Sequence, residues 1–141
     1  MSLISRPGPR EAGADLLVLA NWEEFTGWFL HHTGKWPKSV RFTLTQRIEN
    51  HAIDIVEMLV VARYEPRVRK RTLRRVNLTL ERMRYLLRLA QRASVVPKAA
   101  FERAMRGFDD TGRMVHGWRQ TIDRRGRLPR SRVRPQHEEG K

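Results

Sequence analysis

Residues 67–94 read RVRKRTLRRVNLTLERMRYLLRLAQRAS, and the apolar positions of this stretch decide the fold. These positions alternate spacings of three and four residues without a slip. An α-helix turns once in about 3.6 residues, so this spacing gathers them on one stripe. The pattern predicts a bundle helix from Pro66 to about Ser94, with its stripe in a helical core. The stripe residues are Leu73, Val76, Leu80, Met83, Leu87 and Ala90.

Two stretches that precede this one also show helical periodicity. The first is 15–32, where Asp15 is expected to cap the helix and Gly34 to end it in a left-handed conformation. The second begins near Pro37 and continues to about residue 63. Their predicted core positions are Val18, Trp22, Phe25 and Phe29 in the first, and Leu44, Ile48, His51, Ile55, Met58 and Ala62 in the second.

A fourth helix is expected from Pro97 to about residue 122. Gly107, Gly112 and Gly117 interrupt it, which indicates close backbone packing or a kink, because glycine is a poor helix former. Its predicted core positions are Phe101, Ala104, Phe108, Thr111, Val115, Trp118 and Ile122.

Four helices with short connections predict an all-α, up-down-up-down four-helix bundle. We divide the chain into a flexible N-terminus (1–13), the bundle (14–123) and a disordered basic tail (124–141). The tail is rich in Arg, Gly, Pro and Glu, so it has little apolar surface to offset the entropy lost on ordering.

The net charge of +14 is concentrated in one helix. Residues 63–92 hold 11 basic and 2 acidic side chains, a net charge of +9, whereas residues 1–62 have a net charge of −1. At 100° per residue, Arg69 falls on the apolar side of the helix. Most of the other basic residues fall on the opposite half, among them Arg63, Arg67, Lys70, Arg71, Arg74, Arg75, Arg82, Arg88 and Arg92.

A basic face of this kind predicts binding to nucleic-acid phosphates. A merely solvated helix face usually mixes signs, because like charges four residues apart repel, and here only Glu65 and Glu81 offset the positive charge. The planar guanidinium of arginine can form two parallel hydrogen bonds to a phosphate, whereas the ammonium of lysine acts as a point charge. No zinc finger, helix-turn-helix or RNA-recognition motif is present, so we expect backbone binding with little sequence preference and a steep salt dependence.

Two further apolar rows lie outside the predicted core stripes. Such rows indicate either a helix wedged between two neighbours or a subunit interface, and incidental surface apolarity is the other explanation for the second row. We expect oligomerisation. The first row is Phe42, Ile53, Val56 and Val60, and the second is Leu78, Tyr85 and Leu89.

No catalytic or metal-binding motif stands out. The chain has no Cys, which excludes disulfides and thiolate chemistry. His51 and Asp54 lie one turn apart, but a single His on an apolar stripe is more often a core residue than a ligand. We therefore expect neither catalysis nor a cofactor. With no apolar segment of membrane length and no secretory signal, we expect a cytoplasmic protein, although a basic helix could also lie on an acidic membrane surface.

Two segments resemble the accessory variability determinant family of diversity-generating retroelements. Residues 33–44, TGKWPKSVRFTL, are similar to the junction before a long helix in that family, and residues 112–118, GRMVHGW, resemble its Gly-x-Met-x-x-Gly-Trp segment. The resemblance covers roughly residues 15–122. A wider four-helix family, which includes proteins encoded within 23S ribosomal RNA intervening sequences, shares these motifs.

The resemblance implies a four-helix bundle assembled into a barrel-like pentamer with a basic surface. It implies a non-catalytic accessory protein that binds the reverse transcriptase of the element and its template RNA or complementary DNA, and so supports mutagenic homing. The alternative is a general nucleic-acid or ribosome-associated binding protein with no enzyme partner.

Overall fold

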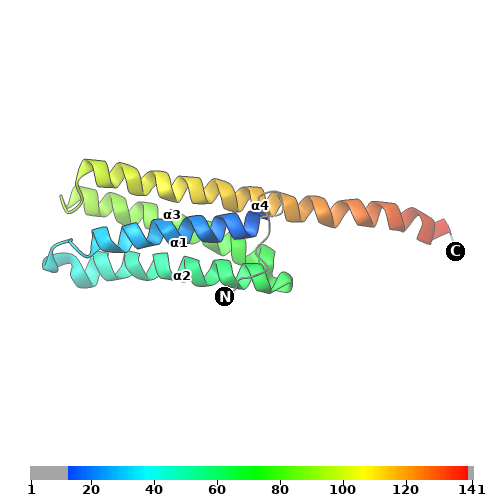
Figure 1. The fold of residues 1–141 in the computed structure, drawn as a ribbon, viewed down its shortest axis with the longest axis horizontal. Helices are drawn as coiled ribbons and strands as arrows, with labels where there is room; N and C mark the ends of the chain where they lie inside the picture. The colour runs from blue at the N-terminus through cyan, green and yellow to red at the C-terminus, as the bar shows by residue number, and fades with distance from the viewer. Residues whose placement is uncertain (1–12, 140–141) are drawn as a thin grey trace.

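The computed structural model describes the backbone of residues 13–139 and the side chains of residues 13–124. Its helices are α1 (Ala14–Thr33), α2 (Gln46–Tyr64), α3 (Arg69–Arg92) and α4 (Lys98–Glu139). No β-strand occurs among residues 13–139, so the predicted all-α class is confirmed. Successive helices run in opposite directions, which is the up-down-up-down order (Figure 1). The expected flexible N-terminus lies almost entirely outside the described residues.

Each helix packs against two neighbours around one core. α1 and α3 both lie against α2 and α4. The stripe predicted for α3 is fully buried at all six positions, so α3 supplies one wall of that core. Most of the core residues predicted for the rest of the bundle are also buried. The exceptions are only half-buried, and they are Phe25, Leu44, His51, Met58, Phe101 and Ile122.

Both ends of α1 lie within one residue of their predicted positions, but neither has the predicted cap. Gly13 precedes the helix and no side chain caps it, whereas the Asp15 carboxylate lies 3.5 Å from the Arg63 guanidinium. Gly34 is right-handed, with φ −62°, because the backbone continues into further turns through Trp36. Among the described residues other than glycine, only Ser94 is left-handed, with φ 59°, at the end of α3.

The second helix begins later than the sequence predicts. Pro37 has an extended conformation, and it is followed by a 3₁₀ turn (Lys38–Val40) and a π turn (Arg41–Thr45) before α2. A π turn holds more residues than an α turn, so the apolar spacing of α2 does not continue through it. Phe42 in this turn is 80% exposed.

The last helix is longer than the sequence predicts. We expected it to end near residue 122 and residues 124–141 to be disordered, but helical backbone continues to Glu139. α4 therefore extends past the other three helices (Figure 1). Continuing an existing helix needs no new nucleation step, and this favours the extension, whereas the two prolines among residues 124–139 oppose it. Residues 140–141 lie outside the described part of the chain.

An aromatic cluster joins α1 to α4. The ring of Phe25 lies 5.0 Å from Trp22 and 5.7 Å from Phe108, measured between centroids. Gly107 faces this ring, and a Cβ atom at Gly107 would overlap it. A Cβ atom at Gly117 would instead meet nothing within 4 Å. The expectation of close backbone packing therefore holds for Gly107 and not for Gly117.

No helix in the described part of the chain is both long enough and apolar enough to cross a membrane.

We predict opposite effects for alanine at these two glycines. Both changes add helix propensity, worth about 1 kcal/mol, and Gly117→Ala should raise the free energy of unfolding by about that amount. Gly107→Ala should be about 1–3 kcal/mol less stable than Gly117→Ala, because the added methyl group must displace the Phe25 ring. Urea denaturation followed by circular dichroism measures both. Equal stabilisation would show that the ring moves aside at no cost.

We also predict a pH dependence at the end of α1. His32 Nε2 accepts a hydrogen bond from Trp36 Nε1 at 3.1 Å, and the His32 ring stacks on Trp28. Burial, and secondarily the Lys35 charge, hold the pKa of His32 below its usual value. The folded state favours the neutral form of His32. Its contribution to the stability of the fold is therefore complete above the pKa of His32 in the unfolded chain, and it is lost as the pH falls toward the lower pKa of the folded protein.

Wild type should therefore lose more stability than His32→Gln between about pH 7.5 and about pH 5.5. Glutamine keeps an acceptor and does not titrate. Both proteins contain the other histidines, including His51, whose pKa is also lowered, so the difference between the two proteins removes their contribution to the pH dependence. The measurement is the urea midpoint of both proteins at each pH, and identical losses would show that His32 is not responsible.

Candidate nucleic-acid interface

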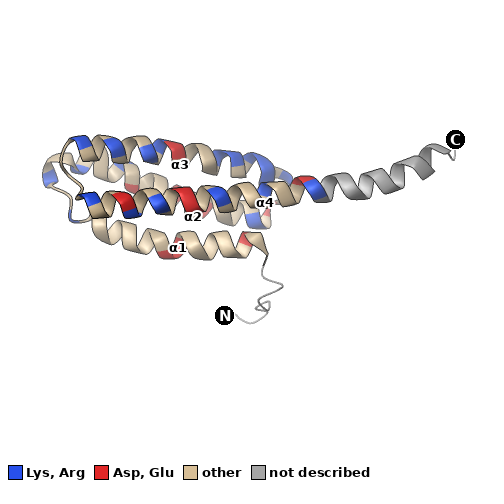
Figure 2. Ribbon diagram, turned by 90° about the horizontal axis from the view of Figure 1, so that it is seen from above, with Lys and Arg blue, Asp and Glu red and all other residues tan. Residues whose placement is uncertain are grey.

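The basic residues of α3 lie mainly on the side of the helix that faces away from the core. We call this side the outer face of α3. Figure 2 shows Lys and Arg along the helix, with few acidic residues between them. The exposed basic residues of the outer face of α3 include Arg67, which lies just before the helix. The others are Lys70, Arg71, Arg74, Arg75, Arg82, Arg88 and Arg92.

Ion pairs divide the predicted binding residues into two groups. Arg63 is half-buried against Asp15, and Lys70 Nζ lies 3.0 Å from an Asp123 carboxylate oxygen. Within the described residues, none of the other predicted binding residues has a carboxylate within ion-pair distance. A second group therefore keeps its charge available to an outside anion: Arg67, Arg71, Arg74, Arg75, Arg82, Arg88 and Arg92.

Arg69 has a structural role. Its guanidinium donates to the carbonyl oxygens of Ala62 at 2.5 Å and Arg63 at 2.8 Å, near the end of α2. The same group lies over the Trp118 ring of α4, 6.0 Å from its centroid. The helical spacing correctly placed Arg69 on the apolar side. It could not show that Arg69 joins three helices, because its partners lie on two other elements.

The apolar residues proposed for a subunit interface are mostly exposed. Phe42, Ile53 and Val60 are exposed beside α2 or on it, whereas Val56 is half-buried against the core. Val56 therefore packs within the bundle. On α3 the second row is more than half exposed: Leu78 at 55%, Tyr85 at 60% and Leu89 at 52%. The sequence interpretation missed Val61 and Tyr64, which are also exposed on α2.

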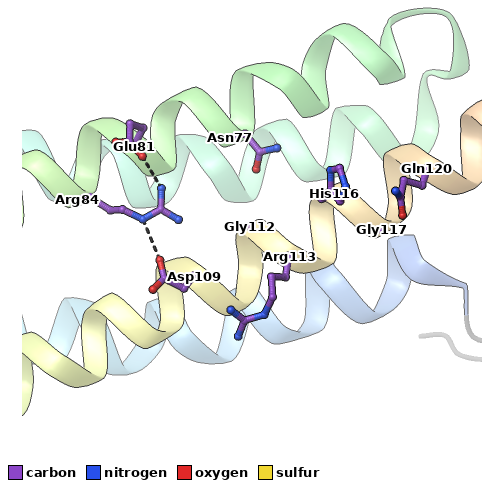
Figure 3. Close-up of a pocket in the computed structure, with 9 residues that line it drawn as sticks. All are labelled: Asn77, Glu81, Arg84, Asp109, Gly112, Arg113, His116, Gly117 and Gln120. Atoms are coloured by element: carbon purple, nitrogen blue, oxygen red, sulfur yellow. Dashed lines mark hydrogen bonds and ion pairs between the residues drawn. The ribbon is translucent and has the colours of Figure 1, made fainter.

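A hollow of about 690 Å³ lies between α3 and α4. Figure 3 shows Arg84 between two carboxylates, with Nη1 2.7 Å from Glu81 and Nε 3.0 Å from Asp109. These two ion pairs neutralise Arg84. The hollow is lined by part of the 112–118 segment, including Gly112, Arg113, His116 and Gly117, together with Asn77 and Gln120.

A smaller hollow, of about 370 Å³, lies between α2 and α3. Its lining includes His51, Asp54 and Glu57 on α2 and Arg75 and Arg82 on α3. Burial, with the Arg82 charge as the next largest effect, lowers the pKa of His51. Over the part of the chain with described side chains, no group of three His, Cys, Asp or Glu residues is arranged to hold a metal ion.

No curated protein and no solved structure is similar to this chain at a significant level. A protein-family model described as bAvd-like matches residues 16–122. This range contains α2, α3 with its outer face, all but the first two residues of α1, and the part of α4 up to residue 122. Because the match covers well over half of the chain, the protein belongs to the bAvd-like family.

Proposed function

We propose that this protein is a non-catalytic accessory protein of a diversity-generating retroelement. It binds the reverse transcriptase of the element and its template RNA or complementary DNA, and thereby supports mutagenic homing in the cytoplasm. Membership of an accessory-protein family supports this role. The structural observation that carries it is the outer face of α3, where seven arginines are exposed without carboxylate partners among the described residues.

The chemistry of this face is suited to phosphates. Guanidinium groups form paired hydrogen bonds to phosphate oxygens, and their binding releases the counterions condensed on a nucleic acid. Seven separate cations along α3 and the turn before it create a strong local field. A backbone interaction of this kind requires no catalytic group and no cofactor.

We further propose that the protein is a homo-oligomer whose subunits meet through Phe42, Ile53 and Val60, the exposed residues of the apolar row predicted on and beside α2. Phe42, Ile53 and Val60 are exposed there and are interspersed with uncharged and acidic residues such as Asn50 and Glu57. Burying such a surface between subunits removes apolar area from water without burying a row of arginines. A pentamer is the assembly that the family resemblance implies.

The proposed binding face is tested by reversing two charges. Arg71→Glu with Arg74→Glu should reduce RNA affinity by at least about tenfold at low salt and flatten the dependence of log affinity on log salt by about one unit per lost phosphate contact. Fluorescence anisotropy with labelled RNA over a salt series measures both quantities.

A matched control changes the same charge elsewhere. Lys98→Glu with Arg106→Glu alters two exposed cations on α4, off the outer face of α3. This control should keep most of the affinity, and both variants should keep the wild-type circular dichroism spectrum. Equal loss in the two variants would mean that net charge alone governs binding, and the assignment to α3 would then be wrong.

The accessory role is tested by co-purification with the reverse transcriptase from the same genome. The two proteins should co-elute in a fixed ratio that survives nuclease treatment, because the complex includes a protein–protein contact. Salt-sensitive RNA retention without co-elution would contradict the accessory role. That result would leave the general or ribosome-associated nucleic-acid binder, which the same basic face supports.

A further inference from the structure

Tyr85 occupies the middle of the outer face of α3. Its side chain is 60% exposed, and the Arg88 guanidinium lies over its ring, 4.8 Å from the centroid. The residues seven positions before and after it are Leu78 and Arg92, so these three side chains follow one line along the helix. An exposed aromatic ring therefore lies among the cations that we propose bind phosphates.

A subunit contact explains this ring less well than it explains the apolar row of α2. Burying the outer face of α3 against protein would also bury the guanidinium groups around Tyr85, which is costly without paired carboxylates. Glu81 is the local carboxylate, and it already pairs with Arg84. Phosphates of a nucleic acid would supply the missing negative charge and bring bases to the same place.

We propose that Tyr85 stacks on unpaired bases, so that the outer face of α3 binds single-stranded nucleic acid in preference to duplex. This inference rests on the proposed nucleic-acid binding. Aromatic rings on a basic surface bind single strands by stacking, with no sequence requirement, because every base has a π face. In a duplex each base face is covered by the neighbouring pair, and Tyr85 would reach only the backbone. Arg88 holds one side of the Tyr85 ring and adds a second planar group for stacking.

The test compares three probes that share phosphates and differ in their bases. They are an oligouridylate of about 20 nucleotides, an RNA duplex of the same length, and inorganic polyphosphate, which has no bases. Tyr85→Leu keeps an apolar side chain and removes the ring, whereas Tyr85→Phe keeps the ring. Tyr64→Leu is the matched control, because Tyr64 is also exposed and has Arg63 over its ring, but it lies on α2.

The wild-type protein should bind the oligouridylate more tightly than the duplex. Tyr85→Leu should weaken oligouridylate binding by roughly 5- to 150-fold, which corresponds to about 1–3 kcal/mol for one stacked base, and leave duplex and polyphosphate binding unchanged. Tyr85→Phe and Tyr64→Leu should bind all three probes as wild type does. Light scattering should give the same mass for every variant.

Each contrary result identifies what has failed. If wild type binds none of the probes, the proposed nucleic-acid binding itself is wrong. If wild type binds them but Tyr85→Leu changes nothing, or weakens all three alike, binding is purely electrostatic and the stacking role is wrong. A changed mass for Tyr85→Leu would make Tyr85 a subunit contact, and an equal loss in Tyr64→Leu would show that stacking is not specific to α3.

Discussion

The burial of one face of α3 is the constraint on which the rest of the structure depends. Its six core residues are fully buried against α2 and α4, and this fixes the rotation of the helix about its own axis. Because helical geometry leaves no freedom once that face is fixed, the arginines between the core positions must point outward. The same packing that builds the core therefore also builds the basic surface. The proposed phosphate binding therefore needs no separate structural element.

The sequence predicted the features that depend on periodicity and missed those that depend on distant partners. The core stripe of α3 followed from its spacing, and so did the position of Arg69. The ion pair between Asp15 and Arg63 joins residues that are far apart in the chain, so Asp15 was mistaken for a helix cap. The π turn before α2 was also missed, because no residue type specifies it and it breaks the spacing from which helices are inferred.

The candidate site shows the same division. Spacing identified the residues on the outer face of α3, but it could not show that Lys70 meets Asp123 while Arg71 and Arg74 meet no carboxylate among the described residues. Arg84 is the clearest case. Its partner Glu81 lies three residues earlier and was visible in the sequence, whereas Asp109 comes from α4, and only the tertiary structure brings it to 3.0 Å.

The seven arginines of the outer face of α3 that have no carboxylate partner among the described residues also affect the folding equilibrium. Their mutual repulsion exists only while the helix holds them at fixed spacing, and the unfolded chain relaxes it by moving them apart. A polyanion that binds the folded form alone removes the repulsion and adds its own binding free energy to stability. On the proposed function, the protein without a bound nucleic acid is therefore less stable than the complex, and its folding is thermodynamically coupled to that binding.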